Sequence, residues 1–192
     1  SLRIEGGLLV TPSSLAYDLM EPEDLVAIDF CGQPLPSGLP GHERRPSSEW
    51  RLHADVFADR PDAMAVLHCH PIHATALACH DRGIPPFHYM TAVAGGDDIR
   101  CAPYATFGTA ELSAHTVQAL QDRQACLLAH HGLVSLGRDL DQALKIAVEV
   151  ETLAQMYLQA LQLGEPPLLS SSQMEEVHRQ FRGLGYGQAS NN

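Results

Sequence analysis

The chain has 192 residues, 45% of them hydrophobic, and 12 Lys and Arg against 23 Asp and Glu give it a formal net charge of −11. This length suits one globular domain with a substantial core. The negative charge argues against nucleic acid or an anionic membrane surface as the main partner, although a small anionic substrate needs only local donors. The sequence shows neither a signal peptide nor an apolar run approaching the roughly 20 residues that cross a bilayer.

The five cysteines are scattered along the chain, without a C-x-x-C pair. An odd, scattered set indicates reduced thiols, and we therefore expect a cytoplasmic protein. The opening residues are strand-like and lack an initiating Met, so we expect a native N-terminal segment to be missing from the chain. No repeat or shift in composition marks a second domain, and residues 1–192 are expected to form one domain.

Hydrophobic periodicity and turn residues predict a mixture of strands and helices. Apolar residues on or near one face of the last predicted helix include Leu144, Val148 and Tyr157. Periodicity alone does not choose between parallel and antiparallel pairing, so the class is α/β or α+β. The expected elements are strands over 7–12 and 24–32, a loop over 33–46, a helix over 47–58, a strand over 64–70, helices over 71–80 and 111–121, a strand over 125–134 and a long helix over 141–163.

The stretch AVLHCHPIHATA places two histidines, His68 and His70, two residues apart in a predicted strand. Side chains at that spacing share one face of a strand, and two parallel imidazoles suit Zn²⁺. A catalytic zinc needs a third ligand. The AHHG segment, which we expect to end an apolar strand and enter a tight turn, offers His130 or His131; the residues themselves do not choose between them. His73 is expected to lie in the following helix as a packing or supporting residue.

The segment PSSEW puts two hydroxyls, those of Ser47 and Ser48, at a predicted helix N-terminus, an arrangement that favours an anion such as phosphate. Glu49 would lie beside that anion and is a candidate acid or base. The simpler interpretation is that one of these serines is the helix N-cap and that Glu49 compensates the helix dipole. A second hydroxyl-rich turn, TPSS, ends in Ser13 and Ser14.

Six segments carry a resemblance to a known family: LLVTPSS, DLVAIDFCG, PSSEWRLHADVFADRPDAMAVLHCH, IPPFHYMTAVAGGDDIRCAPYATFGTAELS, LLAHHGLVSLG and ALKIAVEVETLAQMYL. Their order and spacing are similar to those of the class II aldolase/adducin family, over residues 1 to about 185 and most densely over 46–158. The resemblance implies a single α/β domain of three layers, with a central, mainly antiparallel sheet flanked by helices. It also implies a cyclic homotetramer with active sites between subunits.

The resemblance further assigns roles to individual residues. It implies one zinc ion per subunit on His68, His70 and His131, with Glu49 as the catalytic glutamate and a fourth zinc ligand before substrate arrives. Tyr89 matches a tyrosine that a neighbouring subunit contributes to the site. The implied site for the substrate phosphate consists of Ser13, Ser14, Ser47 and Ser48.

Three departures from the family pattern concern the substrate site. A Gly-Asn-x-Ser-x-Arg segment survives only as Ser1-Leu2-Arg3, so its phosphate-binding asparagine has no counterpart. Ser14 replaces a glycine, a residue that tolerates positive φ and close approach of a ligand. The tyrosine near the C-terminus that closes a neighbour's site aligns with Leu184, and Tyr186 is the candidate to replace it.

The implied reaction is cleavage of a ketose 1-phosphate, such as L-fuculose 1-phosphate, to dihydroxyacetone phosphate and an aldehyde through an enediolate. A metal Lewis acid can stabilise that intermediate without a Schiff-base lysine, and the only lysine, Lys145, lies in the long predicted helix. In cleavage, Tyr89 would help to remove the hydroxyl proton and Glu49 would return a proton to the enediolate.

Four alternatives belong to the same family: a 4-epimerase, a dehydratase, a decarboxylase and a non-enzymatic adducin-like module. The epimerases commonly have Asp in place of Glu49, and an adducin-like module would have lost the metal ligands. The HYMTAVAGG and APYATFGT segments favour the aldolase over the dehydratase and the decarboxylase. A purely structural zinc site would instead have four closed protein ligands.

Overall fold

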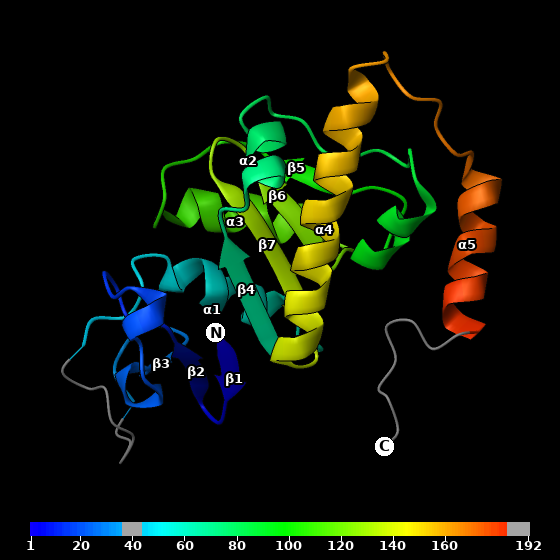
Figure 1. The fold of residues 1–192 in the computed structure, drawn as a ribbon. Coiled ribbons are helices and arrows are strands. Elements are labelled where there is room, and N and C mark those ends of the chain that lie inside the picture. Colours follow the sequence, from blue (N-terminus) through cyan, green and yellow to red (C-terminus); the bar gives the residue numbers. More distant parts are fainter. Residues whose placement is uncertain (36–43, 184–192) are drawn as a thin grey trace.

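The computed structural model describes residues 1–35 and 44–183 (Figure 1). Its strands and helices alternate along most of the chain. In order they are β1 (Leu2–Ile4), β2 (Gly7–Val10), the 3-10 helices η1 (Tyr17–Leu19) and η2 (Pro22–Asp24), β3 (Val26–Asp29), α1 (Trp50–Asp59), β4 (Ala65–Cys69), α2 (Ile72–Ala78), the 3-10 helix η3 (Tyr89–Ala94), β5 (Arg100–Ala102), α3 (Ala110–Ala119), β6 (Ala125–Leu128), β7 (Gly132–Gly137), α4 (Leu140–Leu161) and α5 (Ser171–Gly183).

The strands form one seven-stranded sheet in the order β3-β2-β1-β4-β7-β6-β5. Every pairing is antiparallel except that of β5 with β6, which confirms the predicted, mainly antiparallel sheet. The single strand predicted over 125–134 is wrong, because the chain reverses between β6 and β7, whereas the tight turn predicted at AHHG is confirmed. His130 at that reversal has a φ of 55°, in the left-handed region, and a continuous strand cannot include such a residue.

Two apolar cores, one on each face of the sheet, make the three layers. Cys126 and Leu128 of β6 point into the core that includes residues of α1 and α3. Leu127, between them, points into the core that contains α2 and α4. This alternation follows from the period of two in a strand, and Figure 1 shows α4 running across one face of the sheet.

The long helix α4 buries a different face from the one predicted. Tyr157 is buried as expected, whereas Leu144 and Val148 are 53% and 58% exposed. The residues that face the sheet are Ala143, Ile146, Ala147, Val150, Leu153, Ala154 and Tyr157. Helix α5, which the sequence pattern did not predict, is mostly polar, and Met174 is its buried residue. Within the described ranges, no helix has the length and apolar character that a membrane crossing requires.

Candidate active site

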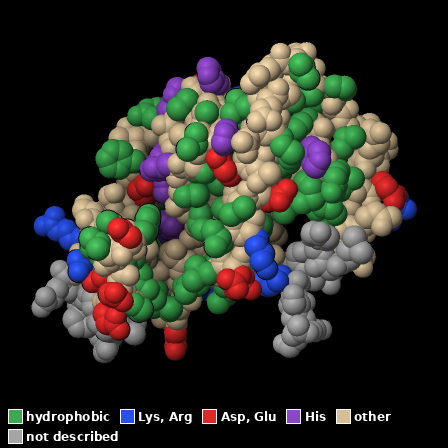
Figure 2. Space-filling model, viewed as in Figure 1, with side chains coloured by type: hydrophobic (Ala, Val, Ile, Leu, Met, Phe, Trp, Pro, Cys, Tyr) green, Lys and Arg blue, Asp and Glu red, His purple; other side chains and the backbone are tan. Residues whose placement is uncertain are grey.

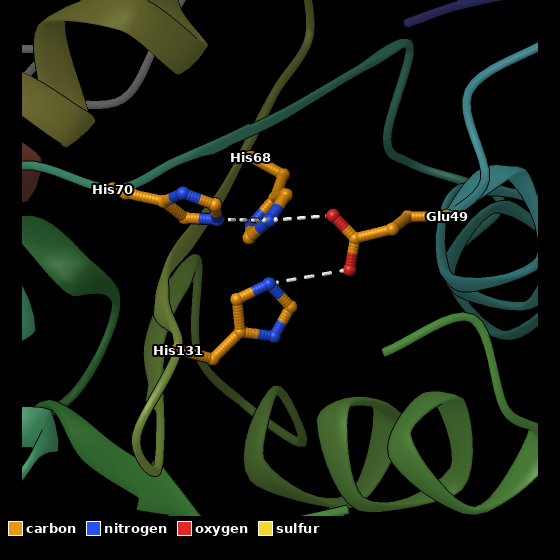
Figure 3. A group of neighbouring side chains, drawn as sticks. All are labelled: Glu49, His68, His70 and His131. Atoms are coloured by element: carbon orange, nitrogen blue, oxygen red, sulfur yellow. Dashed lines mark hydrogen bonds and ion pairs between the residues drawn. The ribbon is translucent and has the colours of Figure 1, made fainter. Parts of the chain in front are cut away.

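Four side chains, those of Glu49, His68, His70 and His131, meet at one end of β4. Their potential ligand atoms all lie within 4.8 Å of one another. Figure 3 shows the three rings and the carboxylate turned toward a common centre, with Glu49 opposite the histidines. In the space-filling view, histidine side chains reach the surface in the region where β4 and α2 meet (Figure 2). The site is therefore partly buried, with one of its four members exposed.

Pairing of β4 with β7 supplies two of the histidines. His68 lies opposite Val134 in this ladder, and its Nδ1 is 2.9 Å from the carbonyl oxygen of Leu133. An N–H on Nδ1 donating to that carbonyl leaves the Nε2 lone pair free for a metal. His131 is the last residue of the turn that precedes β7.

The structure answers which histidine of AHHG joins the cluster. His131 does, whereas His130, with its positive φ, has a half-exposed side chain 3.6 Å from Asp81. Two successive residues on opposite sides of a tight turn cannot point the same way, so only one of them faces the site.

His70 follows the last residue of β4 and is the most exposed member of the cluster. Its Nε2 lies 3.1 Å from that of His68. Gly132 packs closely against the ring of His70. A Cβ atom on residue 132 would lie 2.7 Å from His70 Cδ2 and 2.5 Å from the Cys69 carbonyl oxygen. A side chain at position 132 would therefore displace either the ring or the strand.

Glu49 completes the cluster from the start of α1. Its carboxylate oxygens lie 3.0 Å from His68 Nε2 and 3.3 Å from His131 Nε2. Burial raises the pKa of this carboxyl, but contacts with His131 and His68 outweigh the burial and hold the pKa below its usual range. Among the described residues, the buried Oε1 has the ion-pair contact with His131 but no hydrogen bond of good geometry.

The cluster suits a zinc ion. Two nitrogens bound tetrahedrally at about 2.1 Å from zinc lie roughly 3.4 Å apart, close to the spacing of the His68 and His70 nitrogens. Burial and then the neighbouring histidines His68 and His131 lower the pKa of His70, which favours the neutral imidazole that metals bind. Three histidine nitrogens and one carboxylate form a donor set that zinc sites in proteins use.

The start of α1 differs from the prediction in one respect. Glu49 is its N-cap, not Ser47 or Ser48. The Ser47 hydroxyl instead accepts a hydrogen bond from the Glu49 amide at 3.2 Å, and the Ser47 carbonyl accepts one from Trp50. These bonds form a turn ahead of the helix, which leaves the Ser48 hydroxyl outside the capping interactions of α1.

The two serine turns, distant in sequence, lie side by side. Pro12 pairs with Pro46 in an antiparallel bridge, and Ser13 N donates to the Arg45 carbonyl oxygen at 2.9 Å. Ser14 has a φ of 61°, so it keeps the left-handed backbone that glycine would favour. The hydroxyl-rich turns therefore meet next to Glu49.

The candidate tyrosine Tyr89 lies away from the cluster. It begins η3, is 50% exposed, and its ring centroid lies 4.7 Å from that of His88 and 6.5 Å from that of Phe181. The element η3 contacts α4 and α5, and in Figure 1 α4 lies between it and the end of β4. Tyr186, the candidate for closure near the C-terminus, lies outside the described residues.

Sequence reasoning placed His73 in the helix after the histidine pair, and it lies in α2. The sequence did not predict its ion-pair partner, Glu151 of α4, whose Oε1 lies 2.7 Å from His73 Nδ1. A single acidic residue on a long helix carries no pattern that would have revealed this contact.

Comparison with known proteins places the chain in a family. The sequence model of one protein family, the class II aldolase and adducin N-terminal domain, matches residues 1–158. A 5-methylthioribulose-1-phosphate/5-deoxyribulose-1-phosphate aldolase from Rhodospirillum rubrum is 51% identical over 185 residues, 96% of this chain and 81% of that protein. The L-fuculose phosphate aldolase of Escherichia coli K12 is 45% identical over 188 residues, 96% and 84% of the two chains.

A solved structure of an L-fuculose 1-phosphate aldolase superposes with a TM-score of 0.84 at 38% identity, covering 91% of this chain and 79% of the other. The chain therefore belongs to the class II aldolase and adducin family, and it is an enzyme of the aldehyde-lyase class.

Cys69 lies between His68 and His70, and cysteine is a common zinc ligand. Replacing it therefore tests which side chains of this segment bind zinc. The structure packs Cys69 against the core beneath α2 and α4, and burial raises the pKa of its thiol to about 11. Since zinc binds the thiolate, we expect Cys69→Ala to keep the zinc content and affinity of the parent chain. His68→Ala, the matched change one residue earlier, should weaken zinc binding by more than about 100-fold, beyond the usual loss of an outer-shell partner. Zinc per chain and chelator competition measure both, and weakened binding in Cys69→Ala would contradict this donor set.

Proposed function

We propose that this enzyme is a zinc-dependent class II aldolase that cleaves a ketose 1-phosphate to dihydroxyacetone phosphate and an aldehyde. The observation that carries the proposal is the convergence of three histidine nitrogens on the buried carboxylate of Glu49. The serine turns beside Glu49 add hydroxyl groups for a phosphate. Together they provide one place for a metal, an acid or base and an anionic group.

We propose His68, His70 and His131 as the zinc ligands, with Glu49 as a fourth ligand before substrate binds. Bound there, zinc would supply Lewis-acid stabilisation of the negative charge that develops beside the carbonyl group. Metal binding requires neutral imidazoles, and the lowered pKa of His70 supports that state.

Glu49 is the proposed catalytic carboxylate. Contacts with His131 and His68 hold its pKa below the usual range, and a cation bound by those histidines would likewise favour the ionised carboxylate, the state that can accept a proton. In the synthetic direction it removes the proton from the carbon beside the carbonyl of dihydroxyacetone phosphate, and in cleavage it returns that proton. Its buried Oε1, without a hydrogen bond of good geometry, is the oxygen with capacity for this exchange.

Ser13, Ser14, Ser47 and Ser48 form the proposed phosphate site. Their two turns are held together by the Pro12–Pro46 bridge, so hydroxyls from both reach one region. Binding energy at the phosphate, remote from the reacting bond, would orient the substrate relative to Glu49.

We propose a homotetramer with cyclic symmetry, whose active sites lie between subunits. Tyr89 is half-exposed on η3, which packs against α4 and α5, and we propose that it serves a neighbour's cluster, where it would take the hydroxyl proton. The partly exposed Leu144 and Val148 offer apolar surface for a subunit contact, and hydrophobic side chains are exposed over the face shown in Figure 2.

The unpaired state of the five cysteines supports a place in the cytoplasm.

A substrate panel tests the reaction. The zinc-loaded enzyme would be incubated with L-fuculose 1-phosphate, rhamnulose 1-phosphate, 5-deoxyribulose 1-phosphate and 5-methylthioribulose 1-phosphate, and the products identified. We expect dihydroxyacetone phosphate and the matching aldehyde from at least one sugar, lost with a chelator and restored by zinc. Epimer or dehydrated product without aldehyde would instead identify another reaction of the family.

Glu49→Gln tests the catalytic carboxylate. The change keeps the size of the side chain but removes its basicity, so we expect turnover to fall by about 10²- to 10⁴-fold while fold and zinc content are retained. Glu111→Gln, an exposed acid in the first turn of α3, is the control and should leave turnover unchanged. Steady-state kinetics on the best substrate measures both, and near-normal turnover in Glu49→Gln would remove this residue from its role.

Subunit mixing tests the intersubunit site. Glu49→Gln and Tyr89→Phe should each be nearly inactive alone. In a cyclic oligomer reassembled from equal amounts, about one site in four combines an intact Glu49 with a neighbour's intact Tyr89, so about a quarter of the activity should return. The assay follows aldehyde release after denaturation and joint refolding, with each variant refolded alone as the control. A mixture no more active than its components would place Tyr89 outside the neighbour's site.

A further inference from the structure

Of the three histidines in the cluster, His70 has the least support from its own surroundings. His68 is held by the β4–β7 ladder and by the carbonyl of Leu133. His70 lies one residue beyond β4, and the hydrogen bonds of the described residues include none to its Nδ1. The position of its ring therefore depends on the backbone that follows it.

That backbone enters α2 through a residue that cannot cap the helix. The N-cap is Pro71, which has no side-chain acceptor, and the first amides of any helix lack partners within it. A side chain from elsewhere must satisfy the amides of His73 and Ala74, or they are left to solvent.

Glu151 of α4 provides that cap from 77 and 78 residues away in the sequence. Its Oε1 accepts from the His73 amide at 3.0 Å, and its Oε2 accepts from the Ala74 amide at 2.9 Å. The His73 ring contacts Oε1 through Nδ1 at 2.7 Å. Both oxygens of one carboxylate are thus used on the first turn of α2.

Glu151 is itself fixed to the core. Its neighbours Val150 and Leu153 are fully buried in the layer between α4 and the sheet, while the Glu151 side chain is 26% exposed. A partly buried carboxylate with three donors makes charge-assisted hydrogen bonds, which are stronger than neutral ones. The start of α2 is therefore tied to α4 rather than only to the preceding strand.

Only residues 70–72 lie between the last paired residue of β4 and the first amide bound by Glu151. Pro71 has φ fixed by its ring, at −73°, and it also restricts the backbone of the residue before it. With both ends held, this short connection has little freedom, and the ring of His70 is presented against Gly132.

We propose that Glu151 is a positioning residue of the metal site: by capping α2 it holds the β4–α2 connection and keeps His70 in place for the metal. The inference rests on the proposed zinc site, but it concerns metal affinity and not the reaction. Residues that orient a ligand from outside the coordination sphere typically change metal affinity by about 10- to 100-fold when they are replaced.

The test measures the zinc affinity of the full chain without substrate, by competition with a chromophoric chelator. Glu151→Ala should weaken zinc binding by about 10- to 100-fold. Glu151→Gln, which keeps one acceptor oxygen, should weaken zinc binding less. If Glu151→Ala does not fold, the zinc affinity of Glu151→Gln tests the proposal. His73→Ala, which leaves the two amide contacts intact, should have the smallest effect. The control is Glu149→Ala on the same helix, which forms no hydrogen bond or ion pair within the described part of the chain and should bind zinc as the parent does.

A purely structural role would have a different signature. It would lower the melting temperature of the zinc-free protein without changing the zinc dissociation constant of the folded protein or the visible spectrum of its Co²⁺ form. Parental zinc affinity and an unaltered Co²⁺ spectrum in the folded Glu151 variants would overturn the proposal, as would a parent chain that binds no zinc. If the parent binds zinc but cleaves no ketose phosphate, the proposed function fails while the positioning role of Glu151 stands on the affinity data.

Discussion

Strands β4 and β7 run antiparallel in the middle of the sheet, and the candidate site depends on their register. The pairing of Cys69 with Leu133 brings the end of β4 to the start of β7. The end of β4 carries His68, and His70 follows its last residue. The turn before β7 carries His131. A slip of one residue would turn every side chain of β4 to the opposite face, so burial of Val66 and Leu133 in opposite cores also fixes the direction of the histidines.

Electrostatics within the cluster are compatible with a bound divalent cation. Burial works against the charge of Glu49, and the contacts with His68 and His131 compensate for it. The same crowding, added to burial, lowers the pKa of His70. A divalent cation would satisfy both demands, since it takes neutral imidazoles as ligands and pairs with a carboxylate.

The remaining parts of the site are arranged by long-range packing around this centre. The bridge between Pro12 and Pro46 draws the first serine turn to the second, which precedes Glu49 directly. On the other side, α4 packs on the sheet and reaches α2 through Glu151. The candidate metal site thus lies between two connections that are each secured by a residue far away in the sequence.

Local patterns in the sequence determined a large part of this protein. The strand with His68 and His70 on one face, the PSSE turn with Glu49 and the mixed strand and helix content could be predicted, because each depends on residues within a few positions of one another. Family resemblance selected His131 and the antiparallel sheet, and the fold agrees. Only the tertiary structure decided the exposed side of α4 at Leu144 and Val148 and the cap that Glu151 supplies to α2. These features are set by which faces of distant elements pack together, and hydrophobic periodicity does not encode that choice.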